Sequence, residues 1–164
     1  RRFPDDDYPI GHGDVAPWNV ICREGIPVAL VDWDSCGPVP PLWELAHAVW
    51  LNAQLFDDDW AELHALPSSQ DRLIVAAQIC DGYRVPHRDR SRLADAMIEV
   101  AVRTAAQEAA DSGVTYSSLQ PHEYGQLGGG PPLSGHELTW AMAWRIRSAR
   151  WMIENRARIS KAIS

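Results

Sequence analysis

The chain has 164 residues, which is enough for one domain, and its 46% hydrophobic and 23% charged residues make it too apolar for a disordered protein. A net charge of −7, from 22 acidic and 15 basic residues, disfavours nucleic acid as a partner. The sequence contains no apolar run of the roughly 18–20 residues that cross a membrane, and its three cysteines lack metal-type spacing. A reduced, cytoplasmic protein is the expectation.

The first predicted element is a β-hairpin over residues 19–33. Two short β-prone runs, 18–22 and 28–33, flank a turn marked by Gly25 and Pro27. A rigid proline-rich loop follows at residues 37–41. This hairpin is the only β-structure that the pattern predicts.

The rest of the chain is predicted to be helical. Apolar residues recur at i, i+3 and i+4 over residues 42–56, 70–83, 91–112 and 135–160. Ser68 or Ser69 and Ser91 are the expected N-caps of the second and third helices, and residues 113–135 form a Gly-, Pro- and Ser-rich loop. A stripe of Trp140, Trp144 and Trp151 in the last helix is expected to belong to the core. The predicted fold class is α+β and mostly helical, with a single domain over residues 1–164.

A group of oxygen-bearing side chains precedes and follows the hairpin. The segment His12–Asn19 has the sequence HGDVAPWN, and Asp32 follows it at the end of the second predicted strand. Because the hairpin folds the chain back, Asp32 is expected to return beside Asn19. Together with Asp14, this gives two carboxylates and an amide oxygen, which suit Mg²⁺ rather than zinc.

Phosphoryl transfer needs such a set of side chains. A carboxylate orients the attacking hydroxyl and accepts its proton, while metal ligands hold the cation that neutralises the phosphates. Asp14 would be the base, and Asn19 and Asp32 would hold metal, in the Asp-x-x-x-x-Asn spacing of protein kinases. The structural alternative is an Asx-turn and capping network for Asp14 and Asn19, with Asp32 as a strand-end acid.

This motif, followed by a hydrophobic run into Asp-Trp-Asp, resembles the aminoglycoside phosphotransferase and choline kinase-like family over residues 10–50. The resemblance implies Asp14 as catalytic base, His12 as a structural member of the catalytic loop, and Asn19 and Asp32 as ligands of Mg²⁺ and thereby of ATP or GTP. Glu44 occupies the position of an acidic residue that supports this loop, where the family usually has aspartate. The implied fold is the C-terminal lobe of the protein kinase-like fold.

The resemblance also implies partners. The family's N-terminal nucleotide lobe, with its glycine-rich hairpin and strand lysine, is expected to be missing, because eleven residues precede His12 and Lys161 is the only lysine. The chain would then be a fragment or a natural truncation. The other partner is a small-molecule hydroxyl acceptor such as an aminoglycoside, choline or a sugar. A cationic acceptor could face the acids at 57–59, Glu62 and Glu123, which otherwise form a solvated acidic surface.

Two other functions compete with this one. The first is a non-catalytic kinase-like domain that binds a ligand or a partner. The second is a metal-dependent phosphatase using His12, Asp14 and Asp32, which would need further His and Asp motifs that the sequence does not contain. Neither nucleic acid nor a membrane is an expected partner.

Overall fold

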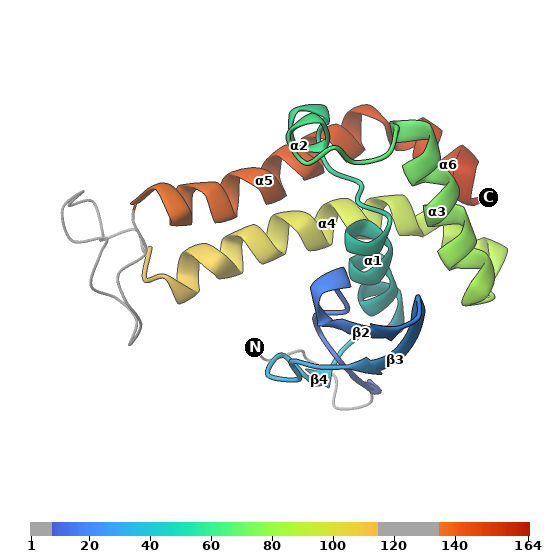
Figure 1. Cartoon of the computed structure of the whole chain (residues 1–164), viewed down its shortest axis with the longest axis horizontal. Helices are drawn as coiled ribbons and strands as arrows, with labels where there is room; N and C mark the ends of the chain where they lie inside the picture. Colours follow the sequence, from blue (N-terminus) through green and yellow to red (C-terminus); the bar gives the residue numbers. More distant parts are fainter. Residues whose placement is uncertain (1–7, 115–134) are drawn as a thin grey trace.

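The computed structural model of this chain describes residues 8–114 and 135–164. Helices dominate, and two small antiparallel sheets accompany them, so the α+β expectation is confirmed (Figure 1). The predicted loop over 113–135 and its Glu123 lie almost wholly outside the described residues. The elements in chain order are β1 (Ile10–Gly11), the 3₁₀ helix η1 (Pro17–Asn19), β2 (Val20–Arg23), β3 (Ile26–Leu30), β4 (Gly37–Pro38), α1 (Pro41–Asn52), α2 (Asp58–Leu63), α3 (Ser69–Gly82), α4 (His87–Asp111), α5 (Gly135–Glu154) and α6 (Arg156–Ile163).

The helical body is built around α4. Figure 1 shows α4 and α5 side by side and running in opposite directions, with α1 packed across α4. Helices α3 and α6 lie at the end of this pair where α4 begins and α5 ends. Large apolar side chains from four of these helices are completely buried where they meet, and this burial drives the packing. They include Trp50 of α1, Met97 of α4, Met152 of α5 and Ile159 of α6.

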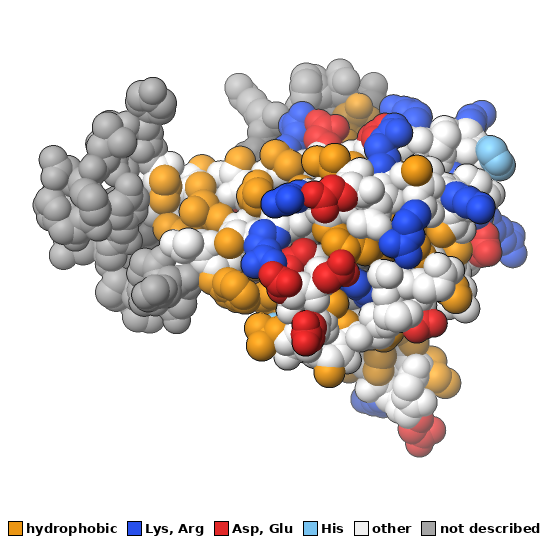
Figure 2. All heavy atoms as spheres, turned by 90° about the horizontal axis from the view of Figure 1, so that it is seen from above, with side chains coloured by type: hydrophobic (Ala, Val, Ile, Leu, Met, Phe, Trp, Pro, Cys, Tyr) orange, Lys and Arg blue, Asp and Glu red, His pale blue; other side chains and the backbone are white. Residues whose placement is uncertain are grey.

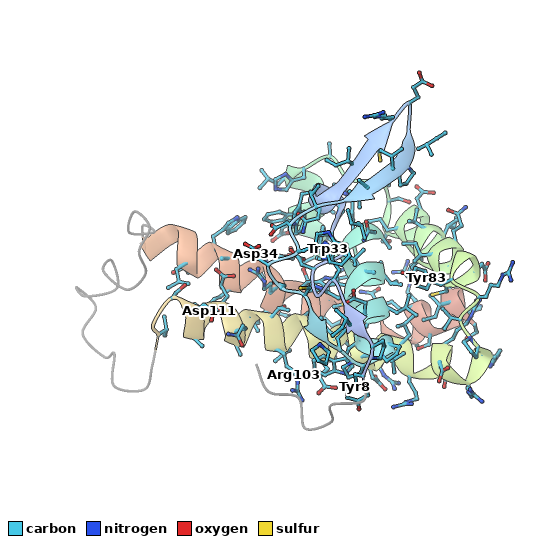
Figure 3. The ribbon with its side chains drawn as sticks, turned by 90° about the horizontal axis from the view of Figure 1, so that it is seen from below. Tyr8, Trp33, Asp34, Tyr83, Arg103 and Asp111 are labelled. Carbon is cyan, nitrogen blue, oxygen red and sulfur yellow. The ribbon has the colours of Figure 1, made fainter. Side chains whose placement is uncertain are left out.

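The predicted hairpin is confirmed as β2 and β3. Val20 pairs with Leu30 and Arg23 pairs with Ile26, which leaves a two-residue turn of Glu24 and Gly25. Both turn residues have positive φ, 50° and 77°, as the type I′ turn of a twisted hairpin requires. Every residue of β3 is exposed, and Figure 3 shows the hairpin projecting from the helical body.

Two elements were not predicted. Strand β1, which precedes the motif His12–Asn19, pairs with β4, with Ile10 opposite Pro38 and Gly11 opposite Gly37. Two-residue strands carry too little pattern to be recognised in a sequence. Helix α2 also went unpredicted, because its six residues are fewer than two helical turns.

The predicted helix boundaries differ from the structure in places. Helix α1 ends at Asn52 rather than near 56, and α4 begins at His87 after Pro86, so Ser91 lies inside that helix instead of capping it. Ser68 caps α3 as expected, by accepting a hydrogen bond from the Asp71 amide at 3.2 Å. The last helix is divided at Asn155 into α5 and α6. No helix in the described part of the chain is long and apolar enough to span a membrane.

Candidate functional site

Glu44 anchors the segment that carries the sequence motif. It lies in the first turn of α1, and its carboxylate accepts hydrogen bonds from two consecutive backbone amides, His12 at 2.7 Å and Gly13 at 3.1 Å. The N-terminus of a helix favours a negative charge at this position. Glu44 therefore supports this loop from the helix side, the position in which the sequence placed it.

Gly13 is the residue that lets the loop turn at this point. Its φ is +80°, and a Cβ built there would lie 2.3 Å from the carbonyl oxygen of Ser35. Both the left-handed backbone and the close approach of another backbone exclude a side chain. The loop is thus held from two directions, by Glu44 and by the segment before β4.

His12 connects the loop to the end of the hairpin. Its side chain is only 3% exposed, and its Nε2 donates to the Val31 carbonyl at 2.9 Å. The other ring nitrogen, Nδ1, accepts from the Asp14 amide at 3.3 Å, so the hydrogen bonds assign the Nε2–H tautomer. The ring also lies 4.5 Å from that of Trp33, centroid to centroid. With both nitrogens occupied, His12 has a positioning geometry and cannot ligate a metal.

Asp14 and Asn19 form the centre of the site. The buried Asn19 amide donates from Nδ2 to both the carboxylate Oδ2 and the backbone carbonyl of Asp14, each at 3.0 Å. Asn52, at the end of α1, donates to the Val15 carbonyl at 2.8 Å. These bonds hold the loop between Asp14 and Asn19 in one conformation. The Asp14 side chain stays 30% exposed.

Asp32 directly follows the last backbone pairing of the β2–β3 hairpin. The Val31 amide donates to the Asn19 carbonyl at 3.0 Å, which extends the β2–β3 pairing by one step and brings the backbone of Asp32 beside that of Asn19. Asp32 is exposed and has a φ of 63°, a left-handed conformation that aspartate adopts more readily than most residues. The hairpin thus returns the chain to Asn19, as the sequence predicted.

Two further side chains near Asp14 were not predicted to belong to the site. The Nε2 of His47, on α1, lies 3.9 Å from Asp14 Oδ1. Arg145, on α5, is half-buried; burial lowers the pKa of its guanidinium, while the negative charges of Glu108 and Asp14 oppose that shift. Arg145 is 131 positions from Asp14 in the chain, so no spacing in the sequence could have linked them.

The side chains of Asn19 and Asp32 end in oxygen donors, the kind of ligand that Mg²⁺ prefers. Mg²⁺ typically takes only one or two carboxylates from a protein and fills its shell with water and phosphate oxygens. Among the described residues, no group of three or more His, Cys, Asp or Glu side chains could hold a metal alone.

The acidic run at 57–59 is part of an ion-pair network. Asp57 caps α2 by accepting from the Trp60 amide, and both Asp57 and Asp59 pair with Arg147 of α5. Asp58 accepts from the indole nitrogen of Trp151 at 3.0 Å. Figure 2 shows acidic and basic side chains next to one another on this face. These carboxylates therefore join α2 to α5 and are partly neutralised, which differs from a solvated acidic loop.

Comparisons with known proteins agree with this geometry. Residues 4–66 match the Phosphotransferase enzyme family. The whole chain is also 39% identical to the trifolitoxin immunity protein of Rhizobium leguminosarum bv. trifolii, of which it spans 57%. No solved structure matches the chain. The resemblance inferred from the sequence is thus confirmed, and the match covers the hairpin, the motif His12–Asn19 and Glu44.

Replacing Glu44 with glutamine is expected to lower the free energy of unfolding by about 1–2 kcal/mol. The amide keeps one acceptor oxygen, but its NH₂ group faces a backbone N–H that the carboxylate now binds. Urea denaturation measures the change, and Glu62→Gln, which makes the same substitution at an exposed position of α2, is the control. Equal stabilities of the two variants would contradict the anchoring role of Glu44.

Proposed function

We propose that this chain is the C-terminal lobe of a kinase-like phosphotransferase, which transfers the terminal phosphate of a nucleoside triphosphate, ATP or GTP, to a hydroxyl group of a small molecule. The observation that carries the proposal is the Asp14–Asn19 pair. One carboxylate oxygen of Asp14 accepts from the Asn19 amide, and the side chain remains partly exposed. The family match over residues 4–66 supports the same chemistry.

In this proposal each side chain has one role. Asp14 Oδ1 accepts the proton of the acceptor hydroxyl as that oxygen forms its bond to the terminal phosphorus and the bond to the nucleoside diphosphate breaks. Asn19 donates from Nδ2 to Asp14, so its Oδ1 and the Asp32 carboxylate are the atoms that would hold Mg²⁺. Bound Mg²⁺ supplies charge neutralisation for the phosphates. His12 and Glu44 keep the loop in place.

The biological role that we propose is protection of a cell from a toxin. The support is the relative's description as a trifolitoxin immunity protein, together with a catalytic motif suited to modifying a hydroxyl-bearing compound. Because the chain spans 57% of that relative, the test uses the complete reading frame that encodes the chain. The second candidate is a non-catalytic domain that confers immunity by binding its ligand. The description of the relative as an immunity protein agrees with this candidate as well.

The experiment expresses the complete reading frame, with and without Asp14→Asn, in a trifolitoxin-sensitive strain. We expect growth on toxin with the natural sequence, and loss of this growth with the variant at equal protein level. In parallel, purified protein is incubated with Mg²⁺, radiolabelled nucleoside triphosphate and the toxin, and label is expected to move to the toxin. Protection that survives Asp14→Asn, without label transfer, would overturn the catalytic proposal in favour of the binding domain.

Replacing Asp32 with asparagine is expected to raise the Mg²⁺ concentration needed for half-maximal phosphoryl transfer by about tenfold, or about 1.4 kcal/mol. The change removes one charge from the proposed metal ligands but keeps the size of the side chain and its tolerance for positive φ. Glu24→Gln, at the exposed turn of the same hairpin, is the control for charge. An unchanged Mg²⁺ dependence in Asp32→Asn would contradict its role as a ligand.

A further inference from the structure

An aromatic cavity of about 500 Å³ lies next to the catalytic loop. It opens between η1, the C-terminal end of α1, α2 and α5, and four aromatic side chains form much of its wall. These are Trp18, Phe56, Trp60 and Trp144. The volume is in the range of small-molecule sites, which are typically apolar with a few polar groups.

The cavity shares its wall with the loop that carries Asp14. Trp18 precedes Asn19, whose amide holds the Asp14 carboxylate. Leu51, another wall residue, precedes Asn52, which holds the Val15 carbonyl. A molecule in this cavity therefore contacts the same short segment that fixes the proposed base.

Ring contacts hold three of the four wall aromatics, Phe56, Trp60 and Trp144. Trp144 stacks on the fully buried Trp50 at 5.4 Å between centroids and meets Phe56 edge-on at 5.6 Å. Trp60 lies 6.0 Å from Trp144 and 4.2 Å from His64. Rings packed in this way keep their orientation without a ligand, so flat apolar surface is available at low entropic cost.

The charges around the cavity disfavour a cationic ligand. None of the described residues that line it is acidic, and its polar side chains are Gln54 and His64. The nearby carboxylates of Asp57 and Asp59 pair with Arg147. The guanidinium of Arg145 lies 4.6 Å from the centre of the Trp144 ring. This ring therefore already has a cation–π partner.

We propose that this cavity binds the acceptor of phosphoryl transfer, and that the acceptor is an uncharged molecule with a flat apolar or aromatic portion beside its hydroxyl group. This proposal differs from the expectation of a cationic acceptor facing the acids at 57–59. The inference rests on the proposed function in so far as the bound molecule is the acceptor of phosphoryl transfer. Binding in the cavity itself is measurable without nucleotide. The Trp144 that was assigned to the core thus also presents a ring to the ligand.

The test measures binding by isothermal titration calorimetry on the protein from the complete reading frame, without nucleotide. The probe is naphthylethanol, an uncharged aromatic alcohol, and the comparison compounds are kanamycin and choline. Naphthylethanol is expected to bind more tightly than either cation. Trp18→Ser, which removes a wall residue that is 60% exposed, is expected to weaken it about tenfold. Tyr83→Ser, at an aromatic residue 65% exposed and outside this cavity, is the matched control.

A second variant tests the charge argument directly. Gln54→Glu changes one lining side chain to an acid of the same size, and it is expected to weaken naphthylethanol binding and to strengthen choline binding. If the natural protein binds kanamycin or choline more tightly than naphthylethanol, or if Trp18→Ser behaves like Tyr83→Ser, the inference is overturned.

The two proposals fail in different ways. Naphthylethanol binding that depends on Trp18, with no phosphoryl transfer to any hydroxyl compound, would overturn the proposed function and keep the cavity as a binding site. Asp14-dependent transfer to kanamycin with no effect of Trp18→Ser would keep the function and overturn the assignment of the cavity.

Discussion

Replacing Asp14 with asparagine is expected to lower the rate of phosphoryl transfer by about 10²–10⁴-fold, the usual contribution of a general base. Asparagine cannot accept the proton of the acceptor hydroxyl. It does keep a side-chain oxygen that can accept from Asn19 Nδ2, so the hydrogen bond that organises the loop is retained. The loss is expected in kcat, with a small change in the KM for nucleotide, because the base acts on the proton rather than on the phosphates.

The control for this prediction is Asp111→Asn, which makes the same substitution at the exposed C-terminal end of α4. Thermal unfolding of both variants is expected to match that of the natural protein within about 0.5 kcal/mol. A rate for Asp14→Asn close to that of Asp111→Asn would show that Asp14 is not the base. A large loss of stability in Asp14→Asn alone would instead support the capping-network interpretation of the Asp14–Asn19 pair.

The candidate site could be predicted largely because its members are close in the chain. Asn19 binds Asp14 five residues away, and one hairpin, whose turn is specified by Glu24 and Gly25, returns the backbone at Asp32 to Asn19. Glu44 was identified through the family resemblance rather than through spacing. Its partners, the amides of His12 and Gly13, become evident only when α1 is placed against the loop.

The parts of the site that sequence reasoning missed depend on long-range packing. The charge of Asp14 acts on the pKa of Arg145 only because α5 packs back along α4. His47 lies near Asp14 because α1 turns the face that carries His47 toward the loop. The position of His47 on that helix also suits a core residue. The aromatic cavity likewise combines residues from η1, α1, α2 and α5, and α2 itself was unpredicted.

The exposed hairpin shows a different limit of pattern analysis. Apolar residues in a predicted strand usually indicate a face packed on a core. Here Ile26 is 64% exposed and Val28 is 52% exposed, and both lie on the hairpin that projects from the helices. The pattern identified the strands correctly, but the burial of their side chains depends on what lies next to them, which the pattern does not contain.

Replacing Arg72 with leucine is expected to lower the free energy of unfolding by about 3–5 kcal/mol, because it removes two charge-assisted hydrogen bonds from the interior. The Arg72 side chain is 2% exposed and donates to the backbone carbonyls of Gln54 and Phe56, each at 2.8 Å. Burial lowers the pKa of this guanidinium, and the charges of Asp58 and Asp57 oppose that shift. Leucine fills part of the space but leaves both carbonyls without this donor.

The measurement is urea denaturation, with Arg92→Leu at an exposed position of α4 as the matched control. Arg72→Lys is expected to recover part of the loss at most, because the lysine ammonium lies on a shorter side chain than the Nη1 that donates to both carbonyls. A stability of Arg72→Leu equal to that of Arg92→Leu would contradict this account. Since Gln54 and Phe56 also line the aromatic cavity, Arg72→Leu is further expected to weaken naphthylethanol binding, although Arg72 itself does not line that cavity.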